Sequence, residues 1–246
     1  MKFNKSQPIL AKEGWIIIVI AFVLALIFWL SVGGFISFLF WVVFIFVLQF
    51  FRDPKRPVSQ TPHAVLAGAD GRICKVQKTV NPYTGEEMML VSTFMNVFNV
   101  HSNWCPVGGV VKEIHYIPGR FINADLDKAS ELNERNAIVV QSEEGPVITW
   151  VQIAGLVARR IVCGLHIGQE VSKGERFGFI RFGSRVDVYV PLDAEILVYV
   201  GQKVRAADTV LALLKVDKST ETPVAENPIE QKIEDGIAEV ENKAGL

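Results

Sequence analysis

The stretch RFGFIRFGSRVDVYVP, from Arg176 to Pro191, decides the fold of this chain. Its second half, after Gly183, alternates valine with polar or aromatic residues, which is typical of a β-strand with one buried face. The phenylalanines of the first half indicate another strand. Because Gly183-Ser184 separates the two strands, its simplest interpretation is a bulge or a tight bend inside a hairpin.

The pair Gly183-Ser184 also permits chemistry. A glycine has no Cβ, so the backbone there reaches dihedral angles closed to other residues, and the Ser184 hydroxyl can approach the preceding carbonyl carbon. This geometry permits an N-to-O acyl shift, in which the amide becomes an ester. The local pattern leaves both interpretations open, and the rest of the chain has to decide between them.

Composition excludes several classes of protein. The 246 residues carry a formal net charge of −1, which argues against a nucleic-acid partner. Half of the residues are hydrophobic, as expected for one medium-sized domain with an apolar segment attached. The cysteines Cys74, Cys105 and Cys163 form no CxxC pair and indicate a reducing compartment. No two histidines have HxxxH or HExxH spacing, so we expect no metal site.

An apolar run without one charged side chain extends from Trp15 to Phe51. One membrane crossing takes about 20 apolar residues, so the run is too long for one crossing and just long enough for two short ones. We predict a helical hairpin that turns at Gly33-Gly34. Cations flank both ends, and the positive-inside rule therefore places the folded domain on the cytoplasmic face of the cell (inner) membrane.

Two other interpretations of the apolar run remain. A signal peptide would have a shorter apolar core followed by a small-residue cleavage site, which the sequence lacks. One long tilted helix would put the folded domain outside the cell, and the cysteine usage disfavours that arrangement.

The rest of the chain divides by composition. Valine and isoleucine, interrupted at short intervals by Gly, Pro, Asn and Asp, predict a mainly antiparallel β domain with a charged helical or looped insertion at 123–136. Eight acids against three lysines predict a largely disordered C-terminal tail. The expected parts are a polar cytoplasmic N-terminus (1–13), the membrane-anchoring hairpin (14–51), a basic, proline-rich juxtamembrane linker (52–64), the β-rich catalytic domain (65–215) and the acidic tail (216–246).

An internal repeat adds detail to the β domain. The segments GQEV at Gly168 and GQKV at Gly201 lie 33 residues apart, and each is followed by a spacer and an apolar strand. They are similar to the paired hammerhead turns of lipoyl and biotinyl carrier domains and predict a flattened antiparallel barrel or sandwich. Neither copy presents a lysine at an exposed turn tip, so a swinging-arm carrier is not expected.

Three residues have the chemistry needed to activate a serine: Asp70, His101 and Ser184. A serine hydroxyl is a weak nucleophile until a base removes its proton, and a carboxylate that orients the base improves the transfer. Taken alone, the three residues are better explained as ordinary interior and turn residues, because any domain of this size contains some Asp, His and Ser.

The sequences and the order of six segments are more specific than these three residues. Between residues 50 and 214 the chain resembles the phosphatidylserine decarboxylase family, most closely its short bacterial form. The segments are FFRDPKRPV, ADGRI, FNVHSNWCPVGGVV, YIPGRFINADLDKASELNERN, GLVARRI and GQEVSKGERFGFIRFGSRVDVYVP.

The resemblance implies a self-processing proenzyme with a covalent pyruvoyl group. Ser184 would attack the carbonyl of Gly183, with His101 as base and Asp70 orienting it. β-Elimination and hydrolysis would leave a pyruvoyl group at position 184 and two chains, β (1–183) and α (184–246). The ketone would form a Schiff base with the amine of phosphatidylserine, release CO2 and yield phosphatidylethanolamine, with His101 as the candidate for proton transfer because its unshifted pKa lies near neutrality.

Some details depart from the family or stay open. Arg185 follows the cleavage site, where long forms have threonine, and Phe98 stands where they carry a second histidine.

Arg52, Lys55 and Arg56 are expected to contact the substrate phosphate. A homodimer is left open. The alternatives are a decarboxylase of another serine-headed lipid, such as an archaetidylserine type, a non-enzymatic membrane adaptor with a lipoyl-like barrel, and a serine hydrolase.

Overall fold

The computed structural model describes residues 8–119, 133–155, 160–181 and 184–215. Three helical segments come first: η1 (Lys12–Gly14), α1 (Trp15–Ser31) and α2 (Gly34–Phe50). The strands are β1 (Ala64–Leu66), β2 (Gly71–Val80), β3 (Glu87–Met95), β4 (Ser102–Trp104), β5 (Gly109–Ile117), β6 (Arg135–Ser142), β7 (Val147–Ala154), β8 (Ile161–Cys163), β9 (Glu170–Val171), β10 (Arg176–Ile180), β11 (Ser184–Pro191), β12 (Glu195–Ile196), β13 (Lys203–Val204) and β14 (Val210–Leu213).

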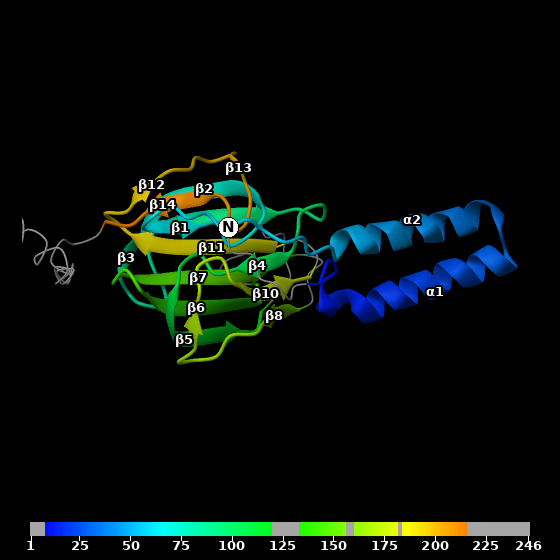
Figure 1. The fold of residues 1–246 in the computed structure, drawn as a ribbon, viewed down its shortest axis with the longest axis horizontal. Helices are drawn as coiled ribbons and strands as arrows, with labels where there is room; N and C mark the ends of the chain where they lie inside the picture. Colours follow the sequence, from blue (N-terminus) through cyan, green and yellow to red (C-terminus); the bar gives the residue numbers. More distant parts are fainter. Residues whose placement is uncertain (1–7, 120–132, 156–159, 182–183, 216–246) are drawn as a thin grey trace, which may run out of the picture. The chain divides into compact units, whose positions relative to one another are not determined.

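The predicted helical hairpin is present (Figure 1). Gly33 and Gly34 form its turn with φ angles of 62° and 60°, a left-handed region that glycine occupies without strain. Together η1 and α1 give 20 residues, Lys12–Ser31, that are apolar and long enough to cross a membrane, and α2 is a shorter apolar helix. Large apolar side chains are exposed along both helices, as suits membrane association.

The β domain is mainly antiparallel, as the sequence predicts. Eight strands form a curled half-barrel in the order β13-β2-β3-β11-β7-β6-β5-β9. Two three-stranded sheets, β1-β14-β12 and β4-β10-β8, complete it. Strand β11 lies inside the large sheet, between β3 and β7 (Figure 1).

The alternation along β11 separates two environments. Val186, Val188 and Val190 are fully buried in the main hydrophobic core, together with Trp150 of β7. The residues between these valines point to the opposite face of the sheet, because successive side chains of a strand alternate. Ser184 has the parity of the valines and therefore lies on the core side.

The expected hairpin around Gly183-Ser184 is wrong. Strand β10 pairs with β4 and β8, whereas β11 pairs with β3 and β7, so the two strands belong to different sheets. The chain crosses from the small sheet to the large one between Ile180 and Ser184.

The two GQ turns have the same structure. Gly168 and Gly201 have φ angles of 83° and 95°, and each donates its N–H to a strand of the large sheet. Gln169 and Gln202 each accept a backbone N–H three residues earlier, at 3.2 Å in both copies. The repeat read from the sequence is therefore a structural repeat.

Other expectations are resolved only in part. Most of the 123–136 insertion and all of the 216–246 tail lie outside the described residues, and the end of the insertion belongs to β6. The three cysteines are free thiols.

Candidate active site

Ser184 is the first residue of β11 and is fully buried. It lies opposite Met95 of β3 on one side and Ala154 of β7 on the other. Its hydroxyl points to the Met95 sulfur, with Oγ and Sδ 3.8 Å apart. Pairing on both sides fixes the backbone at this position.

His101 is also fully buried and lies at the end of the loop that follows β3. Its Nδ1 is 3.0 Å from the carbonyl oxygen of Asn99. A carbonyl only accepts hydrogen bonds, so this contact assigns the proton to Nδ1 and leaves Nε2 as the basic nitrogen. The ring packs on Phe50, with ring centroids 4.3 Å apart.

The expectation that the pKa of His101 lies near neutrality is not met. Burial lowers this pKa to about 4, the Asn99 carbonyl raises it in part, and the positive charge of Arg52 lowers it further. His101 is therefore neutral at physiological pH. A neutral imidazole accepts a proton readily, but it donates one only after it has accepted one.

Asp70 lies in the turn before β2 and has partners other than those expected. Its carboxylate forms an ion pair with the buried Arg56 and accepts the backbone N–H of Ala206 at 2.9 Å. Among the described residues, no hydrogen bond of Asp70 goes to His101. The contact that fixes the His101 tautomer comes from a backbone carbonyl instead.

The three predicted phosphate contacts differ in their surroundings. Arg56 is 6% exposed and pairs with Asp70. Arg52 is half-buried and donates to the carbonyl oxygens of Gln49 and Phe98 at 2.7 and 2.8 Å. Lys55 is exposed. The Arg56 position is the least available to a ligand.

The backbone brings the predicted cleavage site close to His101. The N–H of Ile180 donates to the carbonyl oxygen of His101 at 3.1 Å. Four residues later, Ser184 pairs with Met95, from which the loop to His101 departs. Since four extended residues span at most about 14 Å, Ser184 lies within about that distance of Ile180, which contacts His101. Gly183 itself lies outside the described residues.

Asp70 lies at the same end of the large sheet. Strand β2 begins at Gly71 and pairs with β3, which in turn pairs with β11. A Cβ at Gly71 would collide with the carbonyl oxygen of Phe94, so glycine is required for this close approach. The three predicted residues thus gather at one end of three neighbouring strands, although Asp70 pairs with Arg56.

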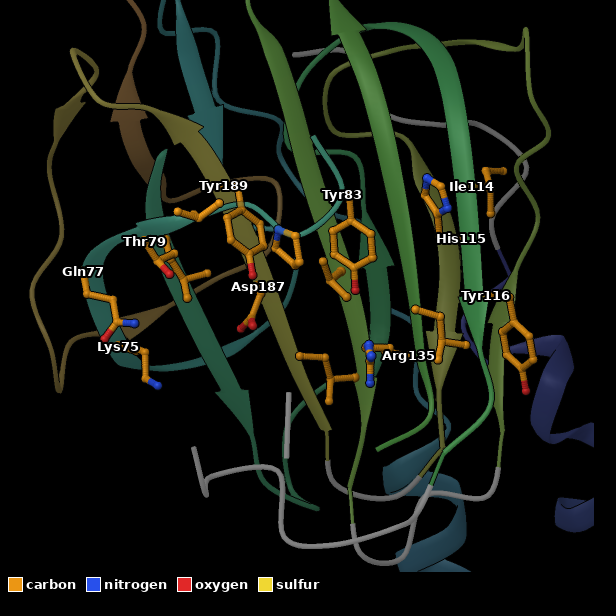
Figure 2. A pocket seen from close by; sticks show the side chains of 16 residues that line it. Lys75, Gln77, Thr79, Tyr83, Ile114, His115, Tyr116, Arg135, Asp187 and Tyr189 are labelled. Carbon is orange, nitrogen blue, oxygen red and sulfur yellow. The ribbon is translucent and has the colours of Figure 1, made fainter. Parts of the chain in front are cut away.

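A cavity lies on the other face of the sheet. It has a volume of about 990 Å³, and its lining includes Asp187 and Tyr189 of β11 (Figure 2). Arg185 points to this face and pairs with Asp187 through two contacts of 2.7 Å. The side chain of Arg185 is therefore directed away from the face that holds the Ser184 hydroxyl.

Sequence reasoning missed several residues that shape the site. Asn99 had a weak signal, because an asparagine two residues before the histidine is typical of a local turn. Phe50 and Met95 had none, since a single phenylalanine or methionine in an apolar run is ordinary core. Arg56 was assigned to a ligand, whereas its partner is Asp70.

Comparison with known proteins gives one consistent result. A family model described as phosphatidylserine decarboxylase matches residues 43–212. A phosphatidylserine decarboxylase proenzyme of Cupriavidus taiwanensis is 54% identical over 214 residues, which are 87% of this chain and 99% of the relative. One of Burkholderia ambifaria is 54% identical over 213 residues, with 86% and 99% of the two chains covered.

These matches and the geometry define the class of protein: the chain is a decarboxylase, a carboxy-lyase made as a proenzyme. The match covers the part of the β domain that contains Asp70, His101 and Ser184. The chain belongs to the phosphatidylserine decarboxylase family.

Proposed function

We propose that this chain is a membrane-anchored proenzyme that cuts itself between Gly183 and Ser184 and then converts phosphatidylserine to phosphatidylethanolamine and CO2. The observation that carries the proposal is the position of Ser184. It is a buried serine, fixed between β3 and β7, four residues after the backbone contact of Ile180 with His101. The relatives of this chain are named for the same activity.

In the proposed cleavage, the Ser184 oxygen bonds to the Gly183 carbonyl carbon and the peptide nitrogen leaves it, which converts amide to ester. The neutral Nε2 of His101 accepts the hydroxyl proton. Loss of the Cα proton of residue 184 then breaks the ester bond and releases the Gly183 carboxylate. Water replaces the nitrogen of the resulting dehydroalanine, ammonia leaves, and a pyruvoyl group remains on the α chain, which begins at residue 184.

The residues around Ser184 fit such a group. A pyruvoyl group has no more heavy atoms than the serine from which it forms, so the buried position needs no extra space. Met95, which faces the hydroxyl, is apolar and flexible, and it accommodates a methyl ketone as readily as a hydroxyl. Both neighbouring strands belong to the β chain and continue to hold residue 184 after the cut.

When present, the pyruvoyl ketone supplies an electron sink for the bond that releases CO2. The buried rings of Phe50 and Phe179 exclude water around His101. His101 returns to the product a proton that it has accepted earlier in the cycle, because its own pKa leaves it neutral at rest.

The proposed substrate is a lipid, and the hairpin supports this choice. An apolar anchor keeps the site at a bilayer surface, which a water-soluble amino acid would not require. Lys55 and Arg52 remain the proposed contacts for the phosphate, and Arg56 is assigned to Asp70 instead. The proposal places the domain on the cytoplasmic face, as the flanking cations predict.

The first test is the intact mass of the purified protein and of its Ser184→Ala variant. We expect two chains for the wild type, with a pyruvoyl end on the smaller, and one uncut chain for Ser184→Ala. Ser172→Ala, an exposed serine in the same domain, is the matched control and should be cut like the wild type. A wild type that stays in one piece, as an adaptor or a hydrolase would, rules out the proposal.

The second test is CO2 release from carboxyl-labelled lipids in vesicles. Phosphatidylserine should be consumed, and free serine should not. An archaeal-type ether lipid with a serine headgroup tests how far the tails matter, because headgroup chemistry and lipid backbone are recognised separately. Cleaved protein that releases no CO2 from phosphatidylserine would contradict the proposed substrate.

A further inference from the structure

The membrane hairpin is held firmly against the β domain at both of its ends. Glu13, at the start of the hairpin, accepts two hydrogen bonds from Arg176 of β10, at 3.0 and 3.2 Å. Asp53, just after the hairpin, pairs with the Nε of the same arginine at 2.6 Å. All three side chains are 15% exposed or less. One buried arginine therefore fixes where the hairpin enters and leaves the domain.

Apolar packing continues this junction toward His101. Phe50 and Phe51 at the end of α2 are fully buried and pack on Phe179 of β10. The ring centroids of Phe51 and Phe179 are 5.6 Å apart with nearly parallel planes. Phe50 lies between this pair and the imidazole of His101, 4.3 Å from it, so one side of the imidazole is covered by the hairpin.

The same end of α2 also holds the loop that carries His101. The Gln49 side chain donates to the Phe98 carbonyl oxygen at 3.1 Å, and Arg52 donates to the same oxygen at 2.8 Å. Within the loop, the side chain of Asn96 accepts the N–H of Phe98, and the Asn99 carbonyl contacts the imidazole. An unbroken series of contacts thus joins the hairpin to Nδ1 of His101.

We propose that the end of the hairpin is part of the active site: Phe50 and Gln49 are positioning residues that hold His101 for its proton transfers. This inference rests on the proposed function of His101. It assigns the hairpin a second role, in addition to membrane attachment, which acts even when the substrate is dissolved in water.

The electrostatic surroundings agree with this geometry. Arg52, just after the hairpin, is a charged side chain that lowers the pKa of His101. The loop side contributes the Asn99 carbonyl, and β10 contributes the uncharged Phe179. The carboxylates of Glu13 and Asp53 both pair with Arg176, which compensates part of their charge. Water admitted by loss of the Phe50 ring would therefore change the environment of the imidazole directly.

The experiment compares Phe50→Ala, Phe50→Leu and Phe38→Ala in detergent micelles. Phe38→Ala is the matched control, since it deletes the same ring from an exposed position of the same helix. The substrate is a short-chain, water-soluble phosphatidylserine, so that membrane binding does not limit the rate. Self-cleavage, kcat and KM are measured for each variant.

We expect Phe50→Ala to lower kcat and the rate of self-cleavage by about tenfold or more, with a much smaller change of KM, because the misplacement acts on the reacting groups. Phe50→Leu should recover part of the loss, and Phe38→Ala should match the wild type. Gln49→Ala keeps the Phe50 ring and should give a smaller loss of kcat. It tests the inference even if Phe50→Ala fails to fold. Equal kcat values in Phe50→Ala and Phe38→Ala would overturn the inference.

One readout does not depend on activity. Histidine modification by diethyl pyrocarbonate, mapped by peptide mass, should be slow at His101 in the wild type and faster in Phe50→Ala, while Phe38→Ala leaves it slow. If the wild type neither cleaves nor decarboxylates, the proposed function fails, and this reactivity still decides whether the hairpin covers His101. Unchanged reactivity of His101 in Phe50→Ala would show that the hairpin does not cover it.

Discussion

The two faces of the large sheet differ: one forms an open cavity, and the other holds the Ser184 hydroxyl. One face is closed: it carries the valines of β11, the main core and the Ser184 hydroxyl. The other face is open: it forms a cavity of about 990 Å³ lined by tyrosines, a histidine and charged side chains (Figure 2). The open face looks more like a binding site, yet the Ser184 hydroxyl lies on the closed one.

This difference indicates that the proposed reactive groups lie where water is excluded. On the open face, Arg185 is paired with Asp187 and His115 with Glu113, so these side chains already have partners. On the closed side, Ser184 faces a sulfur and His101 is neutral because it is buried. A site in which water would hydrolyse an ester or quench a carbanion benefits from the closed arrangement.

The largest effect on stability is expected for Asp187→Ala, on the open face. Asp187 and Arg185 are each 1% exposed, so the change removes the carboxylate from a buried guanidinium. We expect a loss of about 3–5 kcal/mol in the free energy of unfolding, measured by denaturant titration in detergent. This and the stability measurements below use the uncut Ser184→Ala background, which unfolds as one chain. The double variant Arg185→Met with Asp187→Leu should restore most of it. A loss under about 1 kcal/mol in Asp187→Ala would show that the open face hydrates the pair.

The closed face is tested by Val188→Ala. Val188 is fully buried in the main core, and the deletion leaves a cavity that the surrounding strands fill only partly. We expect a loss of about 2–3 kcal/mol by the same titration. Val80→Ala, at an exposed position of β2, is the control and should cost much less. Equal losses in the two variants would contradict the assignment of faces.

The pH dependence of stability tests the dry environment of His101. Its pKa is about 4 in the folded chain and near 6.5 when unfolded, so the unfolded state binds more protons between these values. Stability should therefore fall as the pH drops through this window, by about 2 kcal/mol between about pH 7 and about pH 5. The contribution should be absent in His101→Gln, measured by thermal unfolding at both pH values. An identical pH dependence in the variant would remove His101 as its source.

The smallest effect is expected for His115→Gln on the open face. The His115 side chain is 41% exposed, and its contacts are the 2.7 Å pair with Glu113 and a stack on Tyr83. Exposed pairs contribute little, so we expect a stability change within about 0.5 kcal/mol and unchanged decarboxylation. A strong loss of activity would mean that the open cavity takes part in the reaction.

Much of the fold could be predicted because its signals are local. The charge-free run and Gly33-Gly34 gave the hairpin, the alternation in β11 gave its two faces, and the GQ repeat gave two matching turns. Residue spacing carries each of these signals, and tertiary packing does not override them.

The site could be predicted only in its residue types. Asp70, His101 and Ser184 are predicted from motifs, but several of their partners come from segments far away in the chain. The pKa of His101 depends on Phe50, and Asp70 pairs with Arg56. The expected hairpin at Gly183 failed for the same reason, since the pairing of β10 and β11 with other strands is long-range and leaves no mark in the local pattern.

The position of β11 between β3 and β7 has a consequence for the life of the protein after the proposed cut. The peptide bond that links the two sheets is needed while the chain folds, because it makes the pairing of β11 an intramolecular event. Once it is gone, the eight residue pairs with β3 and the six with β7 still hold the α chain in place. Refolding, however, becomes a reaction between two molecules, without the high effective concentration that a covalent link provides. The mature protein would then be kept together by the slowness of its unfolding, and a single unfolding event would be irreversible.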